Sequence, residues 1–168
     1  MKSPYAWLLF LCSLGIFKGG VYCSAQELPS VQVKNMNGKT IDTSTLNNEG
    51  KPFIISFFAD WCKPCLRELE AIREVYEEWQ EETGVKLIAV SVDDAQNAFK
   101  VKPNVQAYGW KYEVLLDTNS DFKRAMGVNL IPAVFVVDGK GKIVFSRTGY
   151  TNGSEAHLID EVRKLILK

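Results

Sequence analysis

Two cysteines stand three positions apart in the segment FFADWCKPC, residues 57–65. A pair at this spacing fits three kinds of chemistry: half of a metal site, a structural disulfide, or a dithiol that exchanges with other disulfides. The pair follows a run of apolar residues directly, and the chain has only 4 cysteines in all. Which chemistry applies depends on the elements that position Cys62 and Cys65.

The first 25 residues have the order of a secretory signal peptide. Lys2 gives a positive start, an apolar stretch covers residues 6–17, and small residues surround Ala25. A membrane-spanning helix needs about 20 apolar residues, so an uncleaved anchor is the weaker alternative. We expect cleavage after Ala25 or Gln26, one domain over residues 26–168, and a periplasmic or secreted protein. N-terminal sequencing of the mature protein tests this boundary.

Cleavage at this place changes the count of cysteines. Cys12 and Cys23 leave with the signal peptide, and Cys62 and Cys65 remain. A disulfide between residues so close in sequence constrains the unfolded chain very little, which argues against a structural role. A metal site needs further ligands, and the single histidine, His157, falls in the predicted C-terminal helix. A copper-binding or other metal-binding module is therefore the weaker reading, and no metal or other cofactor is expected.

The charge balance is neutral. Lys and Arg number 20, and Asp and Glu number 20. Without a basic surplus, nothing in the composition indicates a nucleic-acid or membrane-surface partner. The chain also has no repeats or low-complexity tracts, so we expect a single domain. The sequence does not fix the oligomeric state, for which a monomer is our expectation.

The cysteine pair lies at a junction between a predicted strand and a predicted helix. The apolar run over residues 51–59 is typical of a central strand that is covered on both faces. From Lys63 the apolar residues recur every three or four positions until Gly84, which predicts an amphipathic helix. A second apolar run, residues 85–92, predicts a parallel strand and hence a βαβ unit with a right-handed crossover.

The rest of the chain predicts an α/β fold with a mixed sheet. Pro103 is expected to divide residues 95–110 into short helical turns. Further elements are a hairpin over 31–42, a strand over 111–117, a helix over 120–126, two antiparallel strands over 133–138 and 142–149, and a helix over 154–167. The predicted core aromatics are Phe53, Phe57, Phe58, Trp79, Phe122, Phe135 and Phe145; the sequence does not decide between core and rim for Trp110.

A cysteine at the start of a helix is predisposed to ionise. The first N–H groups of a helix have no intrahelical partner and the helix dipole is positive there, so the pKa of a Cys62 thiol should fall below about 8.5. Cys65 lies one turn deeper and should keep its proton. This arrangement favours attack by Cys62 and resolution of the mixed disulfide by Cys65. Trp61 either offers a surface to a partner or packs in the interior.

Two segments resemble a known family. FFADWCKPC resembles the F-W-A-x-W-C-x-P-C of thioredoxins, and MGVNLIPAVFVVD followed by KIVFSRTGY resembles their Gly-Val-x-x-Ile-Pro segment and hairpin. With VLLDTNSDFKRAMGV and the signal peptide, the chain resembles the TlpA/ResA-like extracytoplasmic thioredoxins. The resemblance implies a thioredoxin-like fold: a central mixed β-sheet flanked by helices, with an N-terminal hairpin and a TlpA-type insertion over residues 99–109.

The resemblance also implies roles for three residues outside the cysteine pair. Pro132 should form a cis peptide bond facing the cysteines, and Ile131 should offer backbone groups to a bound substrate peptide. Glu68 should be a buried acid that carries the proton of Cys65, the alternative being an exposed glutamate without a function. The chain departs from relatives at two positions: Ser56 replaces the buried Asp of cytoplasmic thioredoxins, and Glu70 replaces a helix proline.

The implied activity is thiol–disulfide exchange with proteins outside the cytoplasm. The family favours a reductant of disulfide-bearing extracytoplasmic proteins, with apocytochrome c as one candidate substrate and a membrane protein as the electron donor. A disulfide oxidant or isomerase remains the alternative direction, because small differences in reduction potential separate the two. Two further hypotheses for the function are weaker: a peroxidase, and a non-catalytic domain that merely retains the fold.

Overall fold

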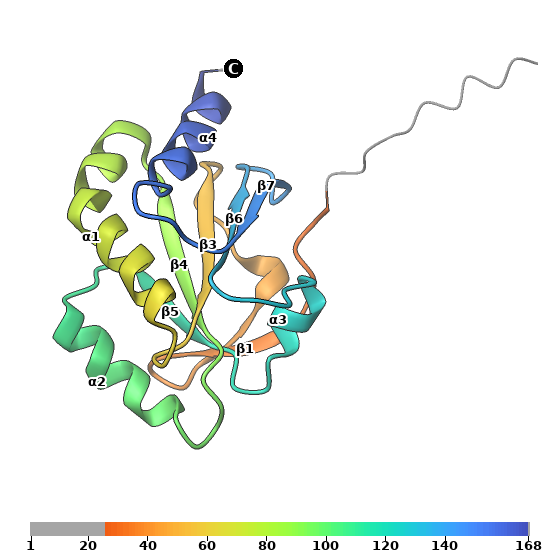
Figure 1. Ribbon diagram of the computed structural model, residues 1–168. Coiled ribbons are helices and arrows are strands. Elements are labelled where there is room, and N and C mark those ends of the chain that lie inside the picture. The colour runs from red at the N-terminus through yellow and green to blue at the C-terminus, as the bar shows by residue number, and fades with distance from the viewer. Residues whose placement is uncertain (1–25, 168) are drawn as a thin grey trace, which may run out of the picture.

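The computed structural model describes residues 26–167, which form one seven-stranded sheet with helices on both faces (Figure 1). The predicted signal peptide lies outside the described residues. The strands are β1 (Gln32–Asn35), β2 (Thr40–Asp42), β3 (Phe53–Phe58), β4 (Lys86–Ser91), β5 (Glu113–Leu116), β6 (Ala133–Val137) and β7 (Ile143–Thr148). The helices are α1 (Lys63–Thr83), α2 (Ala98–Tyr108), α3 (Asp121–Ala125), α4 (Ala156–Ile166) and the short 3-10 helix η1 (Thr43–Thr45).

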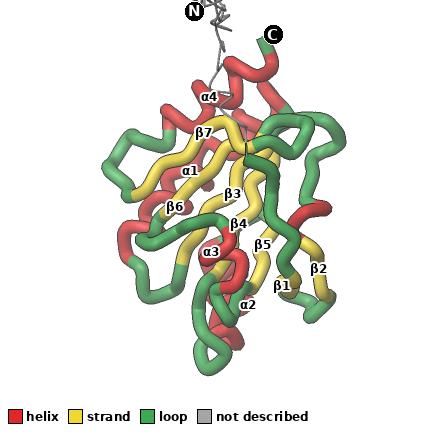
Figure 2. The backbone as a smooth tube through the Cα atoms, turned by 90° about the vertical axis from the view of Figure 1, so that its right-hand side faces the viewer, coloured by secondary structure: helices red, strands yellow, loops and turns green. Residues whose placement is uncertain are grey.

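The sheet is mixed, and β3 lies in its interior as predicted. The strand order is β2-β1-β5-β4-β3-β6-β7 (Figure 2). β3 pairs in parallel with β4 and antiparallel with β6, and β4 pairs in parallel with β5. The predicted βαβ unit and the hairpin of β6 and β7 are therefore confirmed. The N-terminal hairpin is also confirmed, since β1 pairs antiparallel with β2.

The side chains on the two faces of β3 belong to two separate hydrophobic cores. Ile54 and Phe58 belong to the core that contains residues of α1, α2 and α4. Ile55 and Phe57 belong to the core on the opposite face, which contains Phe122 of α3. This follows from the alternation of side chains along a strand. Because both faces are covered, the strand needs apolar residues at nearly every position, as the continuous run in the sequence indicated.

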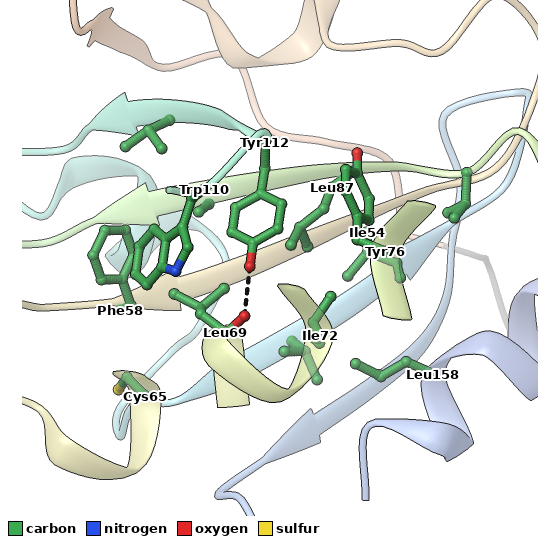
Figure 3. Close-up of a cluster of buried hydrophobic side chains, with 14 of the residues drawn as sticks. Ile54, Phe58, Cys65, Leu69, Ile72, Tyr76, Leu87, Trp110, Tyr112 and Leu158 are labelled. Atoms are coloured by element: carbon green, nitrogen blue, oxygen red, sulfur yellow. Dashed lines mark hydrogen bonds between the residues drawn. The ribbon is translucent and has the colours of Figure 1, made fainter. Parts of the chain in front are cut away.

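Helix α1 starts and stops where the sequence predicted. Its buried face includes Cys65, Leu69 and Ile72, and Figure 3 shows Leu69 and Ile72 packed toward β3 and the aromatic residues. Gly84 ends the helix in the left-handed conformation, with φ 66°, which costs glycine little. The apolar face therefore fixes α1 on the sheet with Cys62 at its first turn.

The prediction that Pro103 would break the helix over residues 95–110 is wrong. α2 runs without interruption from Ala98 to Tyr108 with Pro103 inside it. Proline in a helix interior removes one hydrogen bond, to the carbonyl four residues earlier, and strains the turn. Val101 and Val105 are buried on either side of Pro103 and hold the helix on the core, whereas Pro103 itself is exposed. Tertiary packing thus overrides the local preference.

The aromatic core is confirmed in most of its members. Trp110 is buried and packs edge to face on Phe58 with ring centroids 5.4 Å apart, which places it in the core (Figure 3). Phe135 and Phe145 are only partly buried, because they belong to strands near the β7 edge of the sheet. The predicted core aromatics that are fully or nearly fully buried are Phe53, Phe57, Phe58, Trp79 and Phe122.

Two features of the described residues concern membrane anchoring and metal binding. No helix within residues 26–167 combines the length and apolar character that crossing a membrane requires. In the same part of the chain, no group of three or more His, Cys, Asp or Glu side chains could hold a metal ion. His157 is exposed near the start of α4.

Candidate active site

Cys62 and Cys65 form a disulfide at the start of α1. Their Cα atoms are 5.3 Å apart. Cys62 is the residue that precedes the first turn of the helix, and its carbonyl accepts a hydrogen bond from the N–H of Leu66 at 3.1 Å. Cys62 keeps 5% of its surface exposed, whereas Cys65 is completely buried. Within this pair, only Cys62 is open to a partner.

The helix start favours a thiolate on Cys62 once the disulfide is reduced. Among the described residues, no side chain caps the first N–H groups of α1, and Cys62 lies at the positive end of the helix dipole. Pro64 lies in the first turn, where a backbone N–H would have no partner within the helix, so its missing N–H costs no helical hydrogen bond. The sequence argument for a reactive Cys62 and a sheltered Cys65 therefore has a geometric basis.

Trp61 directly precedes the disulfide in the chain, and the Ile131–Pro132 pair lies at the same end of the sheet, because Phe57 of β3 pairs with Ala133 of β6. Trp61 is 69% exposed, so the alternative that it packs in the interior is wrong. The Ile131–Pro132 peptide bond is cis, and Pro132 is buried directly before β6. Ile131 is partly buried against the core that contains Cys62 and Cys65. The active-site loop and the loop before β6 thus meet at the same end of the sheet.

Glu68 is completely buried one turn after Cys65 on α1. Its Oε1 accepts a hydrogen bond from Nη2 of Arg147 on β7, and the two side chains form an ion pair. Burial raises the pKa of Glu68 to about 7, although the charge and the hydrogen bond of Arg147 act in the opposite direction. The alternative of an exposed, unpaired glutamate is therefore wrong. The carboxyl can gain and lose a proton near neutral pH.

A second buried carboxylate supports the loop that carries the cysteines. Asp93 lies just beyond β4, accepts a hydrogen bond from the N–H of Asp60 at 3.0 Å, and accepts another from the hydroxyl of Ser91 at 2.9 Å. Asp60 in turn accepts a hydrogen bond from Asn104 of α2 at 2.9 Å. Burial raises the pKa of Asp60, and Asn104 partly opposes this. These contacts tie the active-site loop to β4 and α2.

Sequence reasoning missed Arg147 and Asp93. Arg147 lies 79 positions from Glu68 in the chain, and only the fold brings the two together. Asp93 had one available signal, because a polar residue directly after a buried parallel strand lies at the edge where such strands end. Ser56, which replaces the buried Asp of cytoplasmic relatives, is buried, and its Oγ has no hydrogen-bond partner among the described residues.

A surface groove of about 820 Å³ lies beside the active-site helix. Leu66 and Arg67, which follow Cys65 directly, form one wall, and Tyr108 at the end of α2 forms another. The predicted insertion over 99–109 thus supplies α2 and part of this groove. Cys62 and Cys65 do not line the groove.

The site and the fold together define a class of protein. A disulfide at the start of α1, a cis-proline before β6 and a mixed sheet covered on both faces are the features of a thioredoxin-fold protein with a redox-active cysteine pair. Comparison with known sequences agrees, because residues 25–146 match the AhpC/TSA family.

Relatives of known function identify the group of thioredoxin-fold proteins to which this chain is similar. The thiol-disulfide oxidoreductase ResA of Bacillus subtilis is 30% identical over 157 residues, which cover 89% of this chain and 85% of that protein. ResA of Bacillus thuringiensis is 34% identical over 119 residues, and the match spans 71% of this chain and 66% of the relative. This chain belongs to the AhpC/TSA family and, within it, to the ResA-like thiol-disulfide oxidoreductases.

Solved structures confirm the thioredoxin-like fold. An uncharacterized thioredoxin-like protein from Porphyromonas gingivalis is 66% identical, with a TM-score of 0.76 over 83% of this chain and 92% of that chain. StoA from Bacillus subtilis is 25% identical, with a TM-score of 0.62 over 79% of this chain and 96% of that chain.

Proposed function

We propose that this protein reduces disulfides in other proteins outside the cytoplasm through the Cys62–Cys65 pair. The observation that carries the proposal is the pairing of Cys62, which keeps 5% of its surface exposed, with a fully buried Cys65 at one helix start. The N-terminal residues support an extracytoplasmic location, since they have the order of a signal peptide. The similarity to ResA supports dithiol–disulfide chemistry.

The reaction is a two-electron exchange through a mixed disulfide. In the reduced protein the Cys62 thiolate attacks one sulfur of the substrate disulfide, and the other substrate sulfur leaves as a thiolate. Cys65 then loses its proton and attacks the sulfur of Cys62, which releases the second substrate thiolate. The substrate gains two electrons, and the protein returns to the disulfide seen in this structure. A second dithiol, which we assign to a membrane electron donor, must reduce it again.

Glu68 is the group that we assign to the proton of Cys65. It lies on the same helix one turn later, it is buried, and its pKa is raised to about 7, mainly by burial. An acid with a pKa near the working pH is best suited to proton transfer. The neighbouring Ser56 offers no carboxylate for this role.

Trp61 and the Ile131–Pro132 pair are the surface that we assign to the substrate. Trp61 is exposed beside Cys62, and it can contact a polypeptide at little conformational cost. The backbone of Ile131, next to the cis-proline, is suited to pairing with an extended peptide. The substrate is then a disulfide in an accessible chain segment, and apocytochrome c, which carries a closely spaced cysteine pair, is the candidate to test first.

The reduction potential decides between a reductant and an oxidant. We would equilibrate the protein with glutathione buffers, trap the thiols and measure the fraction oxidised. A potential at or below about −270 mV supports the reductant, whereas a value near about −120 mV would overturn it in favour of an oxidant.

A matched pair of variants tests the division of labour between the cysteines. With a disulfide-bearing apocytochrome c peptide, Cys65→Ser should accumulate a mixed disulfide through Cys62, because nothing resolves it. Cys62→Ser should accumulate none, because Cys65 is buried. Equal trapping by both variants would contradict the assignment of Cys62 as the attacking sulfur.

A further inference from the structure

The contacts of Glu68 extend beyond the active-site helix. Oε1 of Glu68 is held by Arg147, whereas Oε2 is buried and has no hydrogen-bond partner among the described residues. A buried carboxylate oxygen without a partner is costly unless it is protonated or used. In the oxidised state seen here the sulfur of Cys65 carries no proton, so Oε2 is the oxygen that is free to receive one after reduction.

Arg147 is itself fixed by the segment that joins β7 to α4. Its Nη1 donates to the carbonyl of Gly149 at 3.1 Å and also to the hydroxyl of Ser154. The side chain of Arg147 is 18% exposed and that of Glu68 is fully buried, so Arg147 partly reaches the surface and covers the carboxylate beneath it. Such contacts fix the guanidinium in one orientation, which a lysine could not reproduce.

We propose that Arg147 is a positioning residue for thiol–disulfide exchange: it holds Glu68 through Oε1 and favours the ionised form of this carboxylate against the effect of burial, so that Oε2 can accept the proton of Cys65. The inference rests on the proposed function and extends it to a residue on another strand. Without the guanidinium, burial would favour a protonated Glu68, which cannot take up a second proton.

Two other ionisable groups of the described residues interact with Glu68, namely Glu155 and Tyr150. Glu155, at the start of α4, opposes ionisation of Glu68 through its negative charge and accepts a hydrogen bond from the Tyr150 hydroxyl at 3.1 Å. The pKa of Tyr150 is raised, first by burial, so its phenol remains neutral at the pH values of interest. Arg147 is therefore the group that favours the carboxylate among these neighbours.

A single-turnover assay separates the two steps of exchange. Cys62 of the reduced protein attacks dithiobis(nitrobenzoate) and releases a first thionitrobenzoate; Cys65 then attacks the sulfur of Cys62 and releases a second one. The rate of the first release reports Cys62, and the rate of the second reports deprotonation of Cys65. Both rates are measured as a function of pH in the wild type and in each variant.

Arg147→Met should move the pH midpoint of the second release upward by roughly 1 to 3 pH units, the range by which a nearby opposite charge lowers a carboxylate pKa. The midpoint of the first release should not move. Arg147→Lys keeps the positive charge but lacks the several N–H donors of the planar guanidinium. It should give an intermediate pH midpoint of the second release. Ser154→Ala removes the hydroxyl that accepts from Arg147 and, at 3.3 Å, from the N–H of Thr151. It leaves the Arg147 side chain in place, should give a smaller shift, and serves if Arg147→Met does not fold.

Arg73→Met is the matched control, since Arg73 forms an ion pair with Glu70 on the exposed side of the same helix. It should leave both midpoints unchanged. If Arg147→Met and Ser154→Ala fold and keep the wild-type midpoint of the second release, the inference is wrong although the exchange activity stands. If the wild-type protein releases no thionitrobenzoate at all, the proposed function itself fails.

Discussion

At the scale of single residues, the structure distinguishes two carboxylates by their surroundings. Glu68 and Glu70 lie two positions apart on α1, and each pairs with an arginine. Burial dominates at Glu68 and raises its pKa to about 7, whereas hydrogen bonding to Arg73 dominates at Glu70 and lowers its pKa. One helix therefore carries a titrating acid on its buried face and an ordinary surface acid beside it.

The raised pKa of Glu68 should make stability depend on pH. The ordinary pKa is 4.5 and the folded value is about 7, so between these values the folded protein binds more protons than the unfolded chain. The stabilisation from this site is fully present below about pH 4.5 and is lost as pH rises through about 7. The loss is on the order of 3 kcal/mol, at about 1.4 kcal/mol per pKa unit.

Urea unfolding of the oxidised protein and of Glu68→Gln, compared at about pH 5 and about pH 8, measures this effect. The wild type should lose free energy of unfolding relative to Glu68→Gln between the two pH values. Glu70→Gln is the surface control and should not remove the dependence. Parallel stability curves for the wild type and Glu68→Gln would show that Glu68 titrates normally.

At the scale of elements, α2 shows packing that prevails over local preference. The helix contains Pro103, whose ring removes the donor to the carbonyl of Phe99. Two buried valines hold the helix against the core, and Asn104 donates to Asp60 beside the cysteine loop. In spite of its proline, α2 therefore supports the active-site loop and lines the neighbouring groove.

Pro103→Ala should stabilise the protein. Alanine restores a helical hydrogen bond and is about 3 kcal/mol better than proline in a helix interior, although proline also restricts the unfolded chain by roughly 0.4 to 1 kcal/mol. We expect a net gain of about 2 kcal/mol in chemical unfolding. Gln106→Ala, at another exposed position of α2, should change stability by less than about 0.5 kcal/mol. A loss of stability in Pro103→Ala would mean that α2 needs the proline ring.

At the scale of the whole molecule, loops far apart in sequence meet closely. Gly139, in the turn between β6 and β7, lies against Gly50, which precedes β3. A Cβ atom at Gly139 would stand 1.9 Å from the Gly50 carbonyl oxygen, which is backbone and cannot rotate away. Helices far apart in sequence also meet, since Arg163 of α4 binds Glu82 of α1 through two hydrogen bonds.

Gly139→Ala should destabilise the fold by about 1 to 3 kcal/mol, the usual range for overpacking. Thermal or urea unfolding would measure the loss. A Cβ atom at Gly141, in the same turn, meets nothing within 4 Å, and only the φ of +82° is unfavourable for alanine. Gly141→Ala should therefore lower the free energy of unfolding by about 1 kcal/mol. A smaller effect in Gly139→Ala than in Gly141→Ala would contradict the close approach of the two loops.

The sequence by itself determined the α/β class, the βαβ unit, the helix that begins at the cysteines and the position of the proline before β6. These features depend on periodicity and on motifs that are local in the chain, so a single stretch of residues specifies each. Only the tertiary structure decided the continuous α2, the exposure of Trp61, the support of Asp60 by Asp93, and the Arg147–Glu68 pair. Each of these depends on side chains that distant segments bring together, and no local pattern encodes the free energy of such contacts.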